Sequence, residues 1–438
     1  MKKTRFFYIQ NCVLAGILSC QILFYSAMTR ENQKVENQAK TAEKKNEPEK
    51  EGQVPEKGST EKTDTADREP KSLKKENLTD STQIRVLLMD SSYSSYEHEY
   101  VSGFANGEEF TYSPESPQLQ EGILTVDAGT EGICITSITR QCGNPVYYGK
   151  IEIHRLEKGL NLINELPLET YLKAVIPSEM PSSYEQQALM AQSVCARTYA
   201  WKHMQEKGME GYDADVDDSV NYQVYGNILP QDSTSLAADE TFGQILTKEG
   251  EPVEAYYFST SAGMTSTDEV WGASQPASYL KSARCDFDRN SPWRKWEVSI
   301  PWEVIQNQVK KTFADSGQVF SVQVIKKNAS GAVSCLQIVT ENGVYELEQE
   351  YEIRKFLSPG GCMIYEQNGA QTEGGILLPS AYFSISQKEG EGVWIQGGGY
   401  GHGVGMSQNA ANEMAKQGYS CEEILKYFFD GVEIEEIY

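Results

Sequence analysis

One glutamate in this chain has the sequence surroundings of a catalytic acid. Glu179 lies between Pro177 and Pro181, in the stretch Ser178-Glu179-Met180-Pro181-Ser182. The apolar residues before it follow the spacing of an amphipathic helix from Leu168 to Val175, which Pro177 is expected to end. A carboxylate held at such a corner is partly shielded from water. Shielding of this kind raises the pKa of carboxylates, so that they can donate a proton near neutral pH.

A second helix is expected directly after this corner. Ser182 and Glu185 have the spacing of a capping box, which marks a helix start. Small residues follow and allow a neighbouring element to pack closely; they are Ala188, Ala191, Ser193, Cys195, Ala196 and Ala200. The alternative interpretation of Glu179 is electrostatic, because a glutamate near a helix start also stabilises the positive end of the helix dipole.

The charge balance narrows the class of partner. The chain has 438 residues and a net charge of −24. Because phosphate binding depends on Lys and Arg, the sequence predicts no nucleic-acid partner, whereas a neutral sugar remains compatible. The cysteines beyond residue 30 are scattered and form no CxxC pair, so no disulfide framework is implied. Pairing of Cys134 with Cys142 is left open.

The N-terminal part predicts a membrane anchor and a tether. Phe6 to Met28 is largely apolar and follows the basic residues Lys2, Lys3 and Arg5. This pattern predicts that residues 1–30 form a single transmembrane helix with a cytoplasmic N-terminus and an extracytoplasmic remainder. A cleaved signal peptide is the alternative. Residues 31–82 are charged and polar, which predicts a disordered tether.

The remaining residues, 83–438, predict a mixed α+β fold. Short β-branched runs at 84–89, 123–126, 133–135 and 254–258 read as strands. Helical patterns occur at 301–313, 409–416 and 421–429, besides the two-helix unit around Glu179. Turns at 328–331 and 341–343 divide residues 318–350 into hairpin strands. We therefore expect a two-helix catalytic unit with an inserted β-rich subdomain at about 300–375.

Three motif blocks, in order, resemble the SpoIID/LytB family. The first runs from Leu166–Leu172 through Ser178–Pro181 to Ala196–Ala200, the second combines Phe258–Gly263, Val270–Gly272 and Tyr279–Ser282, and the third is Gly399–Gln408. The resemblance implies a membrane-anchored lytic transglycosylase that cleaves peptidoglycan during sporulation and engulfment. It also implies glycan strands without stem peptides as substrate and a SpoIIP-type amidase as partner. The LytB branch implies the alternative, a non-catalytic glycan-binding or amidase-enhancing protein.

The resemblance assigns Glu179 as the catalytic residue. It is expected to protonate the oxygen between N-acetylmuramic acid and N-acetylglucosamine. The C6 hydroxyl of the muramic acid then attacks C1 and closes a 1,6-anhydro ring. Glycoside hydrolases normally use a second carboxylate, but this intramolecular attack needs no activated water, so one acid that later acts as a base is sufficient.

The same resemblance assigns a set of substrate-binding residues, each with a structural alternative. They are Arg197, Tyr279, Lys281, His402, Ser261 and Gln408. Arg197 is expected to face substrate or another carboxylate, because a tight pair with Glu179 would spoil a proton donor. Tyr279 and Lys281 could be ordinary surface residues, and His402 a structural histidine. Ser407 and Gln408 could instead cap a helix. A serine hydrolase built on Ser261 and His402 is disfavoured, because no Gly-x-Ser-x-Gly motif surrounds the serine.

No metal or other cofactor is expected. Some relatives bind zinc through a Cys and a His just before a Gln-Val-Tyr segment, but neither residue precedes Gln223-Val224-Tyr225 here. The aspartates at 213, 215, 217 and 218 lack the spacing of an EF-hand loop. We interpret them as part of a solvated loop.

Overall fold

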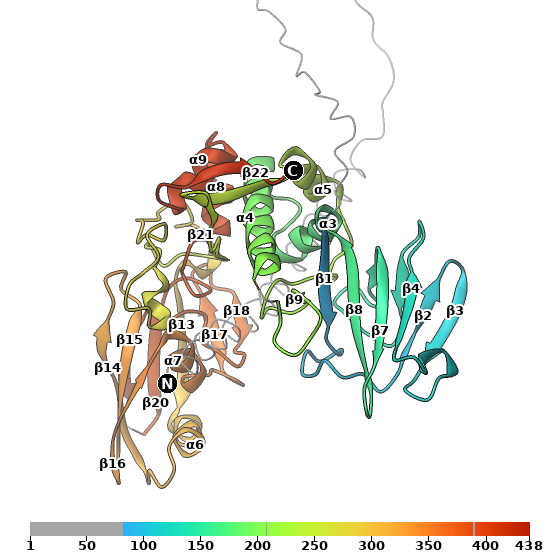
Figure 1. The fold of residues 1–438 in the computed structure, drawn as a ribbon. Coiled ribbons are helices and arrows are strands. Elements are labelled where there is room, and N and C mark those ends of the chain that lie inside the picture. The colour runs from blue at the N-terminus through green and yellow to red at the C-terminus, as the bar shows by residue number, and fades with distance from the viewer. Residues whose placement is uncertain (1–81, 207, 389) are drawn as a thin grey trace, which may run out of the picture. The chain divides into compact units, whose positions relative to one another are not determined.

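The computed structural model describes residues 82–206, 208–388 and 390–438, and it confirms the α+β class. Figure 1 shows the order of the elements along the chain. The predicted membrane anchor, residues 1–30, and the tether up to residue 81 lie outside the described residues. Within the described ranges, no helix is long and apolar enough to span a bilayer.

The first part of the described chain forms two antiparallel-rich sheets (Figure 1). The larger has the order β4-β7-β8-β1-β9, with β1 Gln83–Leu88, β4 Ile123–Asp127, β7 Lys150–Arg155, β8 Leu160–Pro167 and β9 Val216–Asp217. The smaller has the order β3-β2-β5-β6, with β2 Val101–Ala105, β3 Glu108–Tyr112, β5 Ile133–Ile135 and β6 Val146–Tyr147. A short 3-10 turn, Pro117–Leu119, precedes β4. The strands predicted at 84–89, 123–126 and 133–135 are confirmed.

Helix α3, Leu168–Glu179, begins directly after β8 and ends at the candidate acid. Pro177 lies inside this helix, so the prediction that it ends the helix is wrong. A proline costs the helix one N–H donor. Here the last turn is nevertheless kept, because Ile176, Pro177 and Ser178 are buried and the Met180 amide still bonds the Ile176 carbonyl at 2.9 Å.

Helix α4, Gln186–Gln205, begins later than the capping-box pattern predicted. Its N-cap is Glu185, and no side chain caps it, so the Ser182–Glu185 capping box is wrong. The chain turns first, with the Tyr184 amide bonded to the Pro181 carbonyl at 3.0 Å. The Glu185 amide then bonds the Asn412 side-chain oxygen at 2.9 Å. A distant residue therefore sets the start of this helix.

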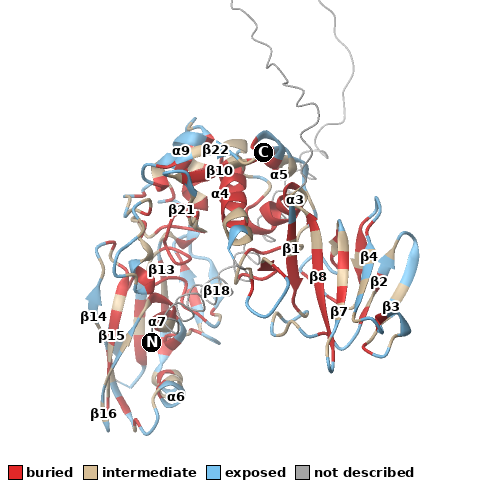
Figure 2. Cartoon of the chain, in the orientation of Figure 1, coloured by how far each residue is buried: buried red, intermediate tan, exposed pale blue. Residues whose placement is uncertain are grey.

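Helix α4 contributes to two hydrophobic cores, and Figure 2 shows it buried along most of its length. Ala196 and Ala200 pack with α3 and the first sheet. Ala188, Ala191 and Cys195 pack in a second core with the C-terminal helices. Alanine side chains are short, so neighbouring backbones can approach the helix from both sides, as its composition predicted.

Short elements surround α4 in the second core. They are α5 Asp232–Glu240, β10 Gln244–Lys248, β11 Glu251–Pro252, β12 Tyr257–Phe258, β21 Met406–Ser407, α8 Gln408–Lys416, α9 Cys421–Phe428 and β22 Glu433–Glu436. Strands β11, β10 and β22 form one sheet, and β12 pairs in parallel with β21. The two C-terminal helices are confirmed. The strand predicted at 254–258 is reduced to β12.

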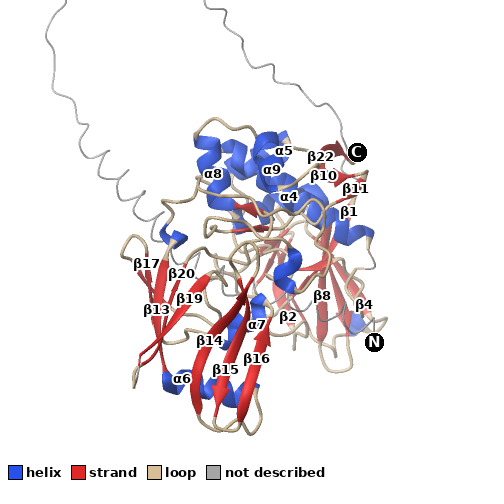
Figure 3. Ribbon diagram, turned by 90° about the vertical axis from the view of Figure 1, so that its left-hand side faces the viewer, coloured by secondary structure: helices blue, strands red, loops and turns tan. Residues whose placement is uncertain are grey.

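Residues 296–397 form the β-rich part (Figure 3). One sheet has the order β18-β17-β13-β20-β19, with β13 Trp296–Pro301, β17 Met363–Glu366, β18 Gln371–Glu373, β19 Phe383–Lys388 and β20 Gly392–Gly397. The other contains β14 Val319–Lys327, β15 Val333–Thr340 and β16 Gly343–Glu348, joined by the two predicted turns. Helices α6, Trp302–Thr312, and α7, Glu350–Phe356, accompany them. The sheet β18-β17-β13-β20-β19 therefore includes strands that begin before and after the predicted interval of 300–375.

A buried ion pair fastens α3 to α4. Glu169, which is 5% exposed, accepts hydrogen bonds from Arg197 Nε and Nη2, each at 2.7 Å. Arg197 is fully buried and also donates to the carbonyl oxygens of Ala238 and Gln244, at 3.2 and 3.1 Å. The Gly243 amide donates to Glu169 at 3.1 Å. The pair therefore ties α3, α4, α5 and β10 together.

We expect Glu169→Gln to destabilise the protein by about 3–5 kcal/mol, because the buried Arg197 charge loses its partner. The matched control is Asp239→Asn, which breaks the exposed pair between Lys173 of α3 and Asp239 of α5 (2.8 Å). An exposed pair contributes less than about 1 kcal/mol. Urea unfolding of both variants measures the difference, and equal losses would contradict this role of the pair.

Two serines near helix starts, the predicted cap Ser182 and the observed cap Ser420, provide a second test. Ser420 forms a capping box with Glu423 at the start of α9, whereas Ser182 caps no helix. Ser420→Ala should therefore cost about 1 kcal/mol, and Ser182→Ala should stay within about 0.5 kcal/mol of wild type. Thermal unfolding of the two variants decides; a larger loss at Ser182 would show that the sequence pattern, and not the structure, is correct.

Candidate active site

Glu179 lies at the carboxyl end of α3 and is 7% exposed. Its Oε1 accepts a hydrogen bond from the backbone amide of Val224 at 2.8 Å. The preceding residue, Ser178, accepts a hydrogen bond from the Ile228 amide at 3.2 Å and donates to the Ala174 carbonyl at 2.7 Å. The segment that contains Val224 and Ile228 therefore contacts the last turn of α3 and holds the carboxylate.

Gln408 holds the main chain of the same residue. Its Nε2 donates to the Glu179 carbonyl oxygen at 3.1 Å and lies 3.3 Å from Gln192 Oε1. Gln408 is 4% exposed. Its amide nitrogen therefore bonds groups inside the protein, and the predicted contact with substrate hydroxyls stays a hypothesis. Its neighbour Ser407 caps α8 by accepting from the Ala410 amide, as the helix-capping alternative predicted.

Two tyrosines, Tyr171 and Tyr257, lie within reach of the charge of Glu179 and are bridged by Gln223. Tyr171 donates to Gln223 Oε1 at 3.2 Å, and Gln223 Nε2 donates to the Tyr257 hydroxyl at 3.3 Å. Burial, followed by the charge of Glu179, raises the pKa of Tyr171 and of Tyr257 well above the usual value for a phenol. Both phenols therefore stay protonated at neutral pH and act only through hydrogen bonds.

His402 has the surroundings of a structural histidine. It is 6% exposed, and its ring lies 5.2 Å from Trp271 and 5.7 Å from Phe258, between ring centres. Its Nδ1 accepts a hydrogen bond from the Val404 amide at 3.0 Å. Burial and the charge of Arg354 lower the pKa of His402 to about 3. The imidazole is therefore expected to be neutral near neutral pH, and its predicted contact with substrate stays a hypothesis.

The glycines beside His402 allow close backbone approach, as predicted. Gly401 and Gly405 have φ angles of 112° and 78°. A Cβ atom at Gly405 would lie 2.1 Å from the Tyr256 carbonyl oxygen, and one at Gly401 would lie 2.8 Å from the Phe258 Cβ. Only glycine fits both the conformation and the space, so these positions join the third motif block to the second.

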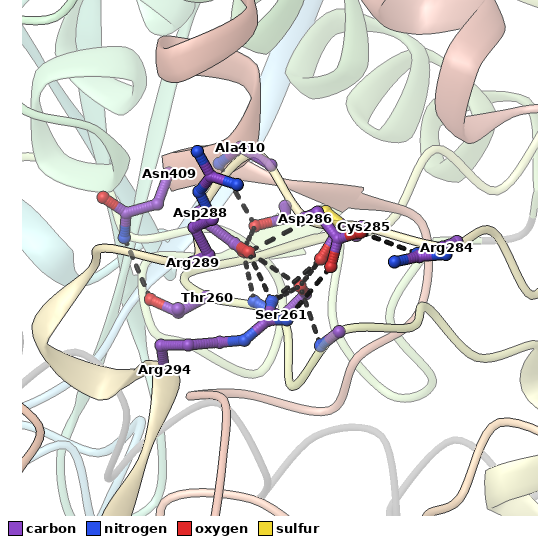
Figure 4. Close-up of polar contacts among 12 residues, drawn as sticks. Thr260, Ser261, Arg284, Cys285, Asp286, Asp288, Arg289, Arg294, Asn409 and Ala410 are labelled. Carbon is purple, nitrogen blue, oxygen red and sulfur yellow. Dashed lines mark hydrogen bonds and ion pairs between the residues drawn. The ribbon is translucent and has the colours of Figure 1, made fainter.

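Ser261 is a structural residue in a polar cluster around Asp288 (Figure 4). Its hydroxyl donates to Asp288 Oδ1 at 2.9 Å, and its amide donates to Oδ2 at 2.6 Å. Arg294 pairs with the same carboxylate at 3.0 Å, and the Ser407 hydroxyl donates to it at 2.8 Å. Ser261 is 1% exposed. The hydroxyl bonds Asp288 rather than His402, which argues against the serine-hydrolase alternative, and the predicted substrate contact stays a hypothesis.

Arg197 pairs with a carboxylate other than Glu179. It bonds Glu169 inside the protein and has no exposed surface. A role of Arg197 toward substrate stays a hypothesis, whereas the alternative of a second carboxylate is confirmed. The reason is geometric, because the helix turns this side chain toward α3 and α5 rather than toward solvent.

Tyr279 and Lys281 are half-buried and keep their predicted roles as hypotheses. The Tyr279 hydroxyl accepts a hydrogen bond from the Glu254 amide at 3.0 Å. Lys281 donates to the Lys426 carbonyl at 3.1 Å and lies 3.7 Å from Asp430. A cavity of about 480 Å³ nearby is lined by Met190, Gln244, Cys421, Glu422, Lys426, Glu433 and Ile434, a set without any of the predicted site residues.

The aspartate-rich loop differs from the prediction. Asp217 and Asp218 are fully buried rather than solvated. Asp217 accepts from the amide and hydroxyl of Ser219, each at 2.8 Å, and Asp218 pairs with Arg140 at 2.5 Å. No group of three or more His, Cys, Asp or Glu residues in the described ranges is arranged to hold a metal ion, and every described cysteine is a free thiol.

No residue pattern predicted the contact between the Val224 amide and Glu179. A backbone amide is present at every residue except proline, so no residue type marks the one that meets Glu179. The only signal nearby is the Gln223-Val224-Tyr225 motif. In this structure, the Gln223 side chain of the motif bonds Tyr171 and Tyr257, and the Val224 amide bonds Glu179.

Glu254 is a second partly buried acid, with its side chain 25% exposed and 3.8 Å from Lys202. Burial raises its pKa from 4.5 to about 7. The folded protein therefore binds this proton more tightly than the unfolded chain. Its contribution to stability is full below pH 4.5 and is lost as the pH rises to about 7.

We expect Glu254→Gln to flatten this loss. Between pH 4.5 and 7, the melting temperature of the variant should fall less steeply than that of wild type, because the variant has no carboxyl group to ionise at this position. Thermal unfolding at several pH values in that window measures both slopes. Parallel curves would show that Glu254 ionises equally easily in the folded and unfolded chains.

Comparisons with known proteins match two parts of the chain to family models. Residues 156–247, which include Glu179 and Val224, match the SpoIID model, described as stage II sporulation protein. Residues 273–405, which include the β-rich part, match a domain of unknown function, DUF8618.

Three relatives extend this similarity. The chain is 32% identical to stage II sporulation protein D of Bacillus subtilis over 63% of this chain and 76% of the relative. It is 33% identical to the protein of the same name in Bacillus amyloliquefaciens, with the same coverage. It is 29% identical to the amidase enhancer of Bacillus subtilis over 59% of this chain and 39% of that protein. On this evidence, the chain belongs to the SpoIID family of stage II sporulation proteins.

Proposed function

We propose that this protein is a lytic transglycosylase that cleaves the glycan strands of peptidoglycan. The observation that carries the proposal is the position of Glu179. This carboxylate ends a buried helix, is almost completely shielded from solvent, and is held by the Val224 amide on its side chain and by Gln408 on its main chain. An acid fixed in this way meets the first requirement of general acid catalysis, which is a defined geometry.

The reaction would use Glu179 twice. Its carboxyl group first gives a proton to the oxygen between N-acetylmuramic acid and N-acetylglucosamine, and the bond from that oxygen to C1 breaks. The C6 hydroxyl of the muramic acid attacks C1 and gives its proton to the carboxylate, which restores the acid. The products are a 1,6-anhydro end and a free hydroxyl on the leaving sugar, so that atoms and protons balance without water.

The setting of this activity is also part of the proposal. Stage II sporulation proteins among the relatives support a role in sporulation. We propose an extracytoplasmic location, with the N-terminal segment as a membrane anchor, and glycan strands without stem peptides as the substrate. An amidase of the SpoIIP type, which removes the peptides, is the proposed partner.

A second candidate is a non-catalytic role as an enhancer of an amidase. Similarity to the amidase enhancer of Bacillus subtilis favours it, although the chain covers only 39% of that relative. The two candidates differ in whether Glu179 is needed for the release of sugar fragments, so one substitution separates them.

We expect Glu179→Gln to lower the release of 1,6-anhydro ends from peptide-free glycan strands by about 10²- to 10⁴-fold, because glutamine keeps the shape of the side chain but cannot donate the proton. Mass spectrometry of the digest measures these ends. The matched control is Glu185→Gln, at an exposed glutamate six positions along the chain, which should keep full activity.

Three results would count against the transglycosylase. Water-terminated reducing ends from the wild type would indicate a hydrolase instead. Equal fragment release by wild type and Glu179→Gln would remove Glu179 from the chemistry. No fragments from the wild type, together with stimulation of an amidase by both wild type and Glu179→Gln, would favour the enhancer.

A further inference from the structure

The segment that holds Glu179 is itself anchored by a buried ion pair. We define the crossing segment as residues 217–228, which begin in β9 and reach the last turn of α3. We propose that the Arg140–Asp218 ion pair positions this segment, and through it the Val224 amide, against the Glu179 carboxylate. Arg140 and Asp218 are thus positioning residues. This inference rests on the proposed function, because it assigns them a part in the same reaction.

The ion pair is completely enclosed by protein. Both side chains are 0% exposed, and the carboxylate Oδ2 of Asp218 accepts from Arg140 Nη2 at 2.5 Å and from Nε at 3.2 Å. The other oxygen of Asp218 accepts from the Met89 amide at 2.9 Å. Arg140 also donates to the carbonyl oxygens of Met89 and Asp90, at 2.7 and 3.1 Å. The crossing segment is thereby fixed to the end of β1.

A short path of hydrogen bonds leads from the pair to the acid. The Tyr225 amide donates to the Asp218 carbonyl at 3.3 Å, which closes the crossing segment into a loop. The Tyr225 hydroxyl donates to Asn164 of β8 at 2.7 Å. Val224 is the residue before Tyr225, and its amide bonds Glu179. Displacement of Asp218 therefore acts on the residue next to the one that holds the carboxylate.

Arg140 also reaches the far end of the crossing segment. The ring of Tyr93 lies against its guanidinium group, with 4.4 Å from the ring centre to Cζ. The Tyr93 hydroxyl donates to the Asn227 side chain at 2.9 Å. Asn227 is next to Ile228, whose amide bonds Ser178. One buried cation thus supports both contacts that the crossing segment makes with the end of α3.

The free energy of a buried ion pair suggests that the Arg140–Asp218 pair serves to hold a defined geometry and not only to add stability. The free-energy cost of removing two charges from water is about as large as the attraction between them. A buried pair is therefore weak evidence for added stability. Such a pair does tolerate few alternative arrangements, because each charge needs its partner. Side chains that support a catalytic group must hold it to within roughly 0.5 Å. The two buried hydrogen bonds from Arg140 to Asp218 can hold the segment to this precision.

The test uses Asp218→Asn in the full-length chain. Hydrogen–deuterium exchange followed by mass spectrometry should show faster uptake in peptides from the crossing segment. Release of 1,6-anhydro ends from peptide-free glycan strands should fall in kcat, by up to about a hundredfold, with little change in KM. If the pair were purely structural, its loss would lower the free energy of unfolding but would not lower kcat while leaving KM unchanged.

Two further variants make the result decisive. Tyr93→Phe removes only the hydroxyl that holds Asn227 and leaves no buried charge unpaired, so it should change both measurements in the same direction by a smaller amount. The matched control is Glu350→Gln, which breaks the enclosed Arg354–Glu350 pair of α7 (2.6 Å). It should lower stability but leave uptake in the crossing segment and kcat unchanged.

The outcomes separate this inference from the proposed function. Faster uptake in the crossing segment with wild-type kcat would overturn the positioning role, as would an equal loss of kcat in Glu350→Gln. If Asp218→Asn does not fold, Tyr93→Phe decides: faster uptake with lower kcat supports the inference, and wild-type values for both overturn it. A wild type that releases no 1,6-anhydro ends sinks the proposed function, and the inference with it, even where uptake shows that the pair anchors the segment.

Discussion

The hydrogen bond from the Val224 amide to the Glu179 carboxylate is the contact around which this candidate site is built. Its two partners are 45 residues apart in the chain, and Gln408, which bonds the Glu179 main chain, is 229 residues away. No local conformation can bring such groups together. The site therefore exists only when the first sheet, the two-helix unit and the C-terminal helices have all folded, so that its chemistry is coupled to the complete tertiary structure.

Helix α4 makes this coupling possible because it belongs to both hydrophobic cores. Its small side chains let other elements approach closely, and its one fully buried arginine, Arg197, is neutralised by Glu169 of α3. Burying a charge is costly unless it is paired and hydrogen-bonded. The same rule applies to Arg140 with Asp218 and to Ser261 with Asp288. Polar residues of the motif blocks, such as Arg197 and Ser261, are thus bonded inside the scaffold.

Local pattern was a reliable guide where an element is stabilised by its own residues. The strands near Ile84, Ile123 and Ile133 and the helix α9 lie where their spacing predicted, and the structure adds a capping box at Ser420. The local pattern was unreliable where burial or a hydrogen bond from a distant residue decides the conformation. Pro177 stays inside α3 because that turn is buried, and α4 starts after Glu185 because Asn412 bonds the Glu185 amide. Asp217 and Asp218 were predicted to lie in a solvated loop, yet both are buried. Ser219 donates a hydrogen bond to Asp217, and Arg140 pairs with Asp218.

The sequence by itself determined the α+β class, most element positions, the family and the identity of the candidate acid, because these depend on residue types and spacings along the chain. It could not determine which side chains meet that acid. The tertiary structure decided that Gln408, Ser261 and Arg197 face the interior, that His402 is buried beside Trp271, and that a backbone amide holds Glu179. The physical reason is that burial and hydrogen bonding are properties of a three-dimensional neighbourhood, and the residues that form it are separated by up to 229 positions.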